Sequence, residues 1–132
     1  MQRTKIGIVG CGNISDIYCE ANNKFDILDI VACADLDIAR AQAKAEQHNI
    51  PKACSTDELL ADPEIDIVVN LTIPQAHAEV ALAAVEAGKS VYNEKPLTIS
   101  REDGIKLLNL AGEKGLRVGG APDTFLGGGL QT

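Results

Sequence analysis

Apolar residues along this chain follow two patterns, short runs bounded by turn residues and longer segments with helical spacing. The short runs predict six β-strands, at 5–10, 29–35, 52–55, 65–72, 89–94 and 116–120. The longer segments predict helices at about 13–23, 36–49, 55–62, 75–87 and 100–115. The run IDIVVNLT at 65–72 is apolar at successive positions, which is typical of a strand buried on both faces.

The ends of the predicted helices carry residues that favour a helix start or stop. Asp37 is expected to cap the second helix, and Pro51 follows its end. Gly88 is expected to adopt the left-handed conformation after the helix at 75–87, and the last helix to end in Gly115. Strands that alternate with helices over short links indicate parallel strands joined by right-handed crossovers. The predicted fold class is therefore α/β, a doubly wound open parallel sheet of about six strands with helices on both faces.

Composition narrows the class of protein. The 132 residues, 45% of them hydrophobic, suffice for one domain with a packed core. The net charge of −7, without a Lys/Arg cluster, argues against a nucleic-acid partner. No apolar run reaches the roughly 20 residues of a membrane span, so we expect no membrane partner, and the N-terminus does not read as a signal peptide. Cys11, Cys19, Cys33 and Cys54 show no C-x-x-C spacing, and we interpret them as reduced thiols of a cytoplasmic protein.

The first predicted strand runs into a glycine-rich turn, VGCGNIS. Gly10, Gly12 and Ser15 stand at G-x-G-x-x-S, directly before a predicted helix. The first glycine permits a tight turn, and the second lets the backbone approach a pyrophosphate, which the amides of Asn13 and Ile14 can bind at the helix start. Ser15 departs from the usual Gly or Ala and is still small enough for close helix packing. The turn predicts a dinucleotide site, and the alternative is a bare turn.

Asp35 ends the second predicted strand. A carboxylate at this position can accept hydrogen bonds from the adenosine ribose hydroxyls and would repel a 2′-phosphate. The next basic residue along the chain is Arg40, so the sequence favours NAD over NADP unless an arginine reaches in from elsewhere. The alternative interpretation makes Asp35 a helix-capping residue.

The segment 71–97, LTIPQAHAEVALAAVEAGKSVYNEKPL, leads from one strand through a helix to another strand that ends in Glu-Lys-Pro at 94–96. Ligands of open α/β sheets bind beyond the carboxyl ends of the strands. Four candidate residues lie at such ends, namely Gly10, Asp35, Thr72 and Lys95. Their convergence predicts a functional cleft.

Lys95 is a candidate acid/base, because partial desolvation and a nearby nicotinamide cation would both lower its pKa. Glu94 would raise that pKa if it lay close, although successive side chains of a strand face opposite sides. The alternative is a solvated charge pair at the end of a strand. His77, early in its helix, is either structural or catalytic. No second ligand stands at metal-binding spacing from it, so we expect no metal.

These segments resemble the N-terminal domain of the glucose–fructose oxidoreductase/inositol dehydrogenase/rhizopine catabolism (Gfo/Idh/MocA) family. The resemblance is carried by four segments, GIVGCGNIS, ACADLDIARA, IDIVVNLTIPQAHAEVALAAVEAGKSVYNEKPL (65–97) and VGGAPDTFLGGGLQT. It covers essentially the whole chain. It implies an NAD(P)-binding Rossmann domain over 1–120. Residues 121–132 would begin the connection to a second, substrate domain that is absent from this chain. The final glycines and Leu-Gln-Thr look like the opening of another helix.

The resemblance also implies residue roles. The residues implied for cofactor binding are Gly10, Gly12, Asn13, Ile14 and Ser15 in the turn, Asp35 after the second strand, and Thr72, Pro74, His77 and Glu94 in the segment 71–97. Asp35 would hold the adenosine ribose and Glu94 the nicotinamide ribose. Lys95 would be catalytic and reach the substrate hydroxyl. The family often has proline where this sequence has Ile73.

The function implied is an NAD-dependent oxidoreductase that moves a hydride between the nicotinamide and a carbinol of a sugar, cyclitol or related polyol derivative. The missing domain would supply most substrate contacts and a second acid/base group, so we expect this chain to bind dinucleotide and to turn over little or nothing by itself. The full-length protein is expected to be a homo-oligomer. The alternatives are a non-catalytic NAD(H)-sensing or interaction module, and a family member that uses transient redox chemistry for elimination or glycoside cleavage.

Overall fold

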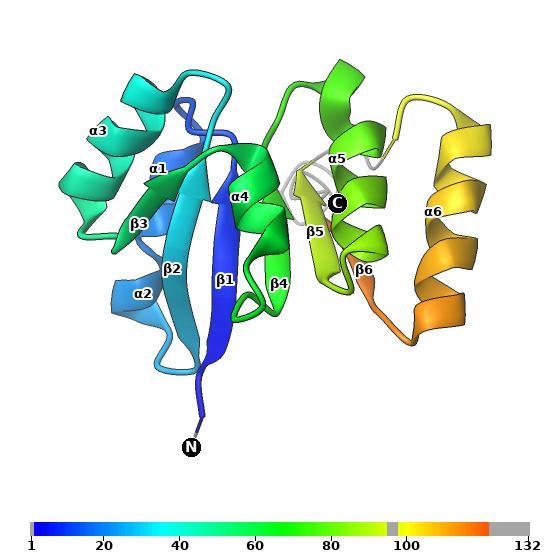
Figure 1. Ribbon diagram of the computed structural model, residues 1–132, viewed down its shortest axis with the longest axis horizontal. Helices are drawn as coiled ribbons and strands as arrows, with labels where there is room; N and C mark the ends of the chain where they lie inside the picture. Colours follow the sequence, from blue (N-terminus) through cyan, green and yellow to red (C-terminus); the bar gives the residue numbers. More distant parts are fainter. Residues whose placement is uncertain (1, 95–97, 122–132) are drawn as a thin grey trace, which may run out of the picture.

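A computed structural model describes residues 2–94 and 98–121 of the chain. They form a six-stranded sheet in the order β3-β2-β1-β4-β5-β6, with every neighbouring pair parallel (Figure 1). The strands are β1 (Thr4–Val9), β2 (Leu28–Ala34), β3 (Lys52–Cys54), β4 (Ile67–Asn70), β5 (Ser90–Glu94) and β6 (Val118–Ala121). The doubly wound α/β class predicted from the sequence is confirmed, and each predicted strand is present with small shifts at its ends.

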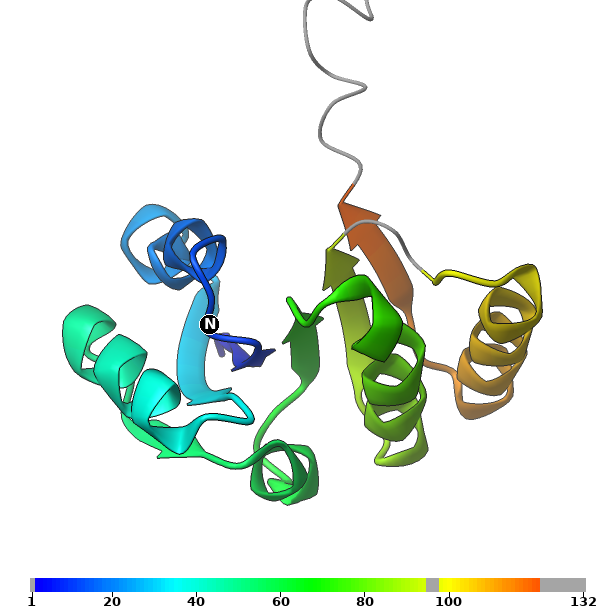
Figure 2. The same cartoon turned by 90° about the horizontal axis from the view of Figure 1, so that it is seen from above.

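Helices lie on both faces of the sheet (Figure 2). One set is α1 (Ser15–Cys19), α2 (Ala21–Lys24) and α3 (Ile38–His48), and the other is α4 (Thr56–Ala61), α5 (Pro74–Glu86) and α6 (Arg101–Lys114). Strand order runs outward from β1 in one direction and from β4 in the other. Because both halves use right-handed crossovers, their helices fall on opposite faces.

Each face of the sheet has its own apolar core. One core includes Val9, Val68 and Val91 of the sheet with Leu59 of α4 and Leu107 of α6. The other includes Ile8, Ile30 and Cys33 of the sheet with Cys19 of α1 and Ala41 of α3. Gly7 of β1 lets α4 approach closely, since an added Cβ would lie 2.8 Å from Leu59 Cδ2. The two cores hold the strand ends in fixed positions relative to one another.

The helix predicted over 13–23 is divided into α1 and α2 at Glu20. Asn22 Oδ1 accepts a hydrogen bond from Ile30 N at 2.8 Å, which ties α2 to β2. The predicted helix ends are confirmed: Asp37 accepts from Ala39 N, and Gly88 and Gly115 have φ of 85° and 68°.

Lys89 is a buried cation next to the start of β5. Its Nζ donates hydrogen bonds to the backbone carbonyls of Asp62 and Ile65. Burial lowers the pKa of Lys89, against the opposing effect of the Asp62 and Asp66 carboxylates. These bonds join the loop before β4 to the start of β5.

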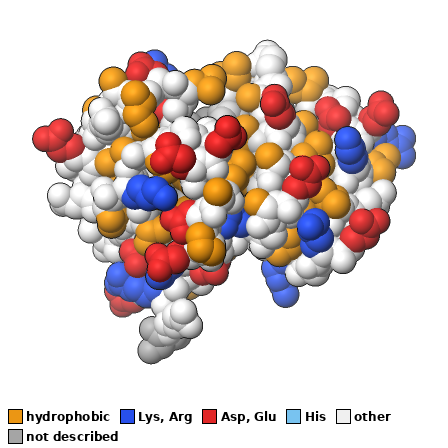
Figure 3. All heavy atoms as spheres, in the orientation of Figure 1, with side chains coloured by type: hydrophobic (Ala, Val, Ile, Leu, Met, Phe, Trp, Pro, Cys, Tyr) orange, Lys and Arg blue, Asp and Glu red, His pale blue; other side chains and the backbone are white. Residues whose placement is uncertain are grey.

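The surface carries charge of both signs. On the face shown in Figure 3, Asp and Glu side chains are interspersed with Lys, Arg and hydrophobic side chains. No helix within residues 2–94 and 98–121 has both the length and the apolar character needed to span a membrane.

Candidate functional site

The glycine-rich turn connects β1 to α1 at the carboxyl edge of the sheet. Gly10 has φ of 102°, a backbone conformation that residues other than glycine rarely adopt. An added Cβ would lie 2.7 Å from the carbonyl carbon and oxygen of Leu71, and Gly10 N donates to Ala34 O at 2.8 Å. The turn therefore packs against the ends of both β2 and β4, and a glycine is required at this position.

Gly12 has a different environment from Gly10. An added Cβ at Gly12 would meet no heavy atom within 4 Å, so the backbone there borders open space. Ser15 is fully buried, and its hydroxyl donates to Gly12 O at 2.6 Å. Asn13 and Ile14 are exposed and lie just before the first turn of α1. Ser15 thus holds the turn from inside, while its outer side stays accessible.

Asp35, directly after β2, joins the turn to the start of α3. Its Oδ2 accepts from Cys11 N at 2.8 Å, and its Oδ1 accepts from Asp37 N at 2.9 Å. Asp37 is the residue that caps α3. The carboxylate of Asp35 therefore holds the backbone of the turn and of the start of α3. Asp35 is only half-buried and so remains partly accessible.

Asn70, the last residue of β4, arranges the turn that follows it. Its Nδ2 donates to His77 O at 3.0 Å, and its Oδ1 accepts from Thr72 Oγ1 at 2.6 Å. Asn70 is fully buried. Asn70 is not among the site residues predicted from the sequence, although an amide within the apolar run at 65–72 was a usable signal, because a buried polar side chain needs partners.

These segments surround a pocket of about 470 Å³. Its lining brings together Gly10, Gly12, Asp35 and Thr72, together with the largely exposed side chain of Ile73. Arg40, Asp57 and Glu79 also line it, from α3, α4 and α5. Sequence reasoning gave Asp57 and Glu79 no role. The volume lies within the range of small-molecule sites in proteins.

The other predicted site residues lie outside this lining, within the part of the chain that is described. They are Asn13, Ile14, Ser15, Pro74, His77 and Glu94. Pro74 is exposed at the first position of α5, and Glu94 is the half-buried last residue of β5. His77 is 1% exposed, which favours the structural interpretation of its ring. Lys95 falls outside the described residues.

Among residues 2–94 and 98–121, no group of three or more His, Cys, Asp or Glu side chains could hold a metal ion. The four cysteines are free and buried. A hydrogen bond with the Cys33 thiol, together with burial, raises the pKa of Cys11 in the turn, and burial raises the pKa of Cys19 to about 11. Because the thiolate is the reactive form, the burial and the raised pKa of these two thiols both disfavour reaction at neutral pH. Their role is packing.

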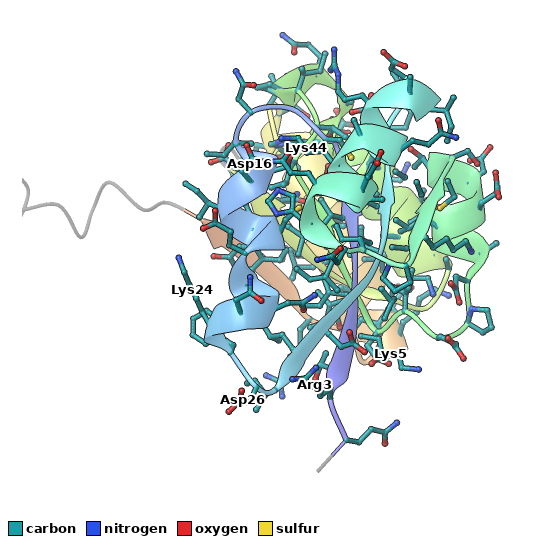
Figure 4. The ribbon with its side chains drawn as sticks, turned by 90° about the vertical axis from the view of Figure 1, so that its left-hand side faces the viewer. Arg3, Lys5, Asp16, Lys24, Asp26 and Lys44 are labelled. Carbon is teal, nitrogen blue, oxygen red and sulfur yellow. The ribbon has the colours of Figure 1, made fainter. Side chains whose placement is uncertain are left out.

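Asp16 follows the turn and holds α1 against α3 (Figure 4). Its Oδ1 accepts a hydrogen bond from Lys44 Nζ and lies 2.9 Å from His48 Nε2. The hydrogen bonds with Lys44 and then His48 lower the pKa of Asp16. The position of the turn is thus tied to α3 through a charged contact.

We expect Asp16→Asn to lower the thermal unfolding temperature at neutral pH and to have no effect in acid. The pKa of Asp16 is lower in the folded chain than the roughly 3.9 of an unfolded chain. Its contacts therefore stabilise the fold above about pH 4, and this stabilisation disappears as the pH falls further and the carboxylate is protonated. Circular dichroism melts across this pH range measure the difference. Glu20→Gln is the control, since the Glu20–Lys24 pair is exposed. A destabilisation by Asp16→Asn that is independent of pH would contradict this explanation.

Comparison with known proteins places the fold in a family. Residues 4–120 match the GFO_IDH_MocA family model, described as "Oxidoreductase family, NAD-binding Rossmann fold". The chain belongs to the Gfo/Idh/MocA family. The resemblance and the Rossmann fold expected from the sequence are confirmed.

Three relatives illustrate the similarity of this Gfo/Idh/MocA domain to known proteins. Trans-1,2-dihydrobenzene-1,2-diol dehydrogenase of Xenopus tropicalis is 38% identical over 74% of this chain and 30% of that protein. Inositol 2-dehydrogenase of Salmonella paratyphi B is 33% identical over 86% of this chain and 35% of that protein. Biliverdin reductase from Synechocystis sp. PCC 6803, solved with biliverdin and NADP+, has a TM-score of 0.90 and 34% identity over 97% of this chain and 40% of that chain. The chain spans about a third of the length of these curated relatives.

Proposed function

We propose that this chain is the NAD-binding domain of an oxidoreductase that transfers a hydride between NAD and a carbinol carbon of a sugar, cyclitol or related polyol derivative. The observation that carries the proposal is the meeting of Gly10, Gly12, Asp35 and Thr72 around one pocket at the carboxyl edge of a doubly wound sheet. Two relatives support the substrate class, because their names specify an inositol and a cyclic diol.

The residues around the pocket fit a dinucleotide. The open space beside Gly12 allows a pyrophosphate to approach the backbone. The oxygens of Asp35 each accept one backbone hydrogen bond and keep further capacity for ribose hydroxyls. The Thr72 hydroxyl donates its hydrogen bond to Asn70 Oδ1, so the Thr72 oxygen can still accept a hydrogen bond from a ligand. When bound, NAD supplies the ring carbon that exchanges the hydride.

Lys95 is the residue that we propose for proton exchange with the substrate hydroxyl. It follows Glu94, and Glu94 ends β5, the strand next to β4 in the sheet. A second acid/base group and most substrate contacts would come from the further length that the relatives have. The support for Lys95 is the sequence Glu-Lys-Pro at 94–96 and the family resemblance.

The charge of the pocket supports NAD over NADP. Its described lining contains the carboxylates of Asp35, Asp57 and Glu79 and a single guanidinium, that of Arg40. A 2′-phosphate would bring negative charge toward this acidic surface. Arg40 is the residue that could offset the repulsion, since an arginine near the ribose accommodates a 2′-phosphate in other dinucleotide-binding folds. We therefore propose NADP as the weaker ligand.

Titration of the chain with NADH, followed by cofactor fluorescence, tests the proposal. We expect saturable binding, with NADPH weaker by about tenfold, or 1.4 kcal/mol. Asp35→Asn keeps one oxygen as an acceptor for a backbone amide and removes the charge, so it should narrow the difference between the two cofactors. If the folded chain binds neither NADH nor NADPH, the proposed function is wrong.

We further propose that the protein is cytoplasmic, which its four free cysteines support. The family resemblance supports a homo-oligomer for the longer protein.

A further inference from the structure

Asn70 is a polar residue at a position where packing alone would favour an apolar one. It ends β4, directly after Val68 and Val69, and its side chain is fully buried. In the sheet it lies between Val9 of β1 and Asn93 of β5. Burying an amide costs free energy unless its hydrogen bonds are made. An amide at this position therefore indicates a task that an aliphatic side chain could not perform.

The hydrogen-bond partners of Asn70 fix which way round its amide lies. Its Nδ2 donates to His77 O at 3.0 Å, and its Oδ1 accepts from Thr72 N at 3.3 Å and from Thr72 Oγ1 at 2.6 Å. A carbonyl oxygen only accepts and a backbone N–H only donates, so the reversed amide would face a group of the wrong kind on each side. Because Oδ1 is an acceptor, the Thr72 hydroxyl is the donor in the bond between them.

We propose that Asn70 is a positioning residue that makes Thr72 a hydrogen-bond acceptor toward the ligand. With its single proton held by Asn70 Oδ1, the Thr72 hydroxyl presents only lone pairs to the pocket that Thr72 lines. Turning the proton toward a ligand would leave Oδ1 with the longer bond to Thr72 N alone, which is costly at a fully buried position. Thr72 itself is only half-buried, so a ligand group that donates a hydrogen bond can reach its oxygen.

The order of the strands indicates which donor this is, and this step rests on the proposed function. Asp35 follows β2, the glycine-rich turn follows β1, and Thr72 lies just beyond β4. These strands are neighbours, so the three sites succeed one another along the carboxyl edge at intervals of roughly 5 Å. With the adenosine ribose at Asp35 and the pyrophosphate at the turn, the next group of the dinucleotide is the nicotinamide ribose. Its hydroxyls can donate to Thr72, whereas pyrophosphate oxygens carry no proton at neutral pH and only accept.

Three ligands separate the ribose from the pyrophosphate. ADP ends at the pyrophosphate, ADP-ribose adds the second ribose, and NADH adds the nicotinamide. Isothermal titration calorimetry measures Kd for each. We expect Thr72→Val to weaken ADP-ribose and NADH by about tenfold, the effect of one lost hydrogen bond, and to leave ADP unchanged. Thr72→Ser keeps the hydroxyl and is the matched control, which should bind all three ligands as the wild type does.

Asn70→Leu removes the acceptor of the Thr72 proton and keeps a side chain of similar size. The freed proton can then turn to the pyrophosphate, so we expect the preference for ADP-ribose over ADP to fall by about fivefold. Thr72→Val should also weaken ADP-ribose less in this background than in the wild type, because the two residues act as a unit. A purely structural role of Asn70 would lower both affinities together and leave the preference unchanged. If thermal unfolding shows that Asn70→Leu does not fold, the Thr72 variants decide the matter.

Two results would overturn the proposal. In the first, Thr72→Val weakens ADP as much as ADP-ribose, which would make Thr72 a phosphate contact, or weakens neither. In the second, Asn70→Leu folds and keeps the wild-type preference for ADP-ribose over ADP. Failure of the proposed function gives a different result, because the folded wild type would then bind none of the three ligands, and the assignment of Thr72 to a ribose would fall with it.

Discussion

Replacing Gly10 by alanine is expected to lower the free energy of unfolding by about 3–5 kcal/mol. Two costs add at this position. Gly10 has φ of 102°, which strains any residue with a Cβ, and that Cβ would overlap the backbone of Leu71 at 2.7 Å. Because the overlapped atoms are backbone, no side-chain rotation relieves the contact. The turn and the end of β4 must separate instead.

Thermal and urea unfolding, followed by circular dichroism, measure this loss. A change of this size corresponds to a fall of about 10–20 °C in the unfolding temperature. Gly88→Ala is the matched control, because Gly88 has φ of 85° and open space around an added Cβ, so it carries the strain without the overlap. If Gly10→Ala proves no more destabilising than Gly88→Ala, the turn does not approach the backbone of Leu71 as closely as described.

The strands and helices were predictable because their signals are local. The apolar run at 65–72 and the capping residue Asp37 act within a few positions of themselves. The break between α1 and α2 was not predictable in this way. The helix is divided at Glu20, and the bond from Ile30 N to the Asn22 side chain then joins α2 to a strand whose position follows only from the folded sheet.

The same distinction between local signals and tertiary packing applies to the candidate site. That Gly10, Asp35 and Thr72 meet was predictable, because parallel strands bring their carboxyl ends to one edge. The contributions of Asp57 and Glu79 were not, since both belong to helices and their facing depends on how each crossover packs. The double hydrogen bonding of Asp35 was also missed, because a strand-end carboxylate has the same sequence pattern with or without backbone partners.

Replacing Gly12 by alanine is expected to weaken NADH binding and to leave stability almost unchanged, in contrast to Gly10→Ala. An added Cβ at Gly12 meets no protein atom within 4 Å, so stability should stay within about 0.5 kcal/mol of the wild type. The same methyl group would occupy the space that a pyrophosphate needs beside the turn. We therefore expect the affinity for NADH to fall by about 100-fold, equivalent to 2.7 kcal/mol.

NADH titration alongside thermal unfolding distinguishes the two substitutions, and this prediction rests on the proposed function. The wild type must bind NADH for the comparison to have meaning, so failure of the proposed function appears first in the wild-type titration. If the wild type binds and Gly12→Ala binds equally well, the dinucleotide does not approach the turn at Gly12, and the pocket is used by another part of the ligand. If Gly12→Ala loses stability as Gly10→Ala does, the open side of the turn is wrong. A stable chain that has lost NADH binding is the result that the geometry of the turn requires.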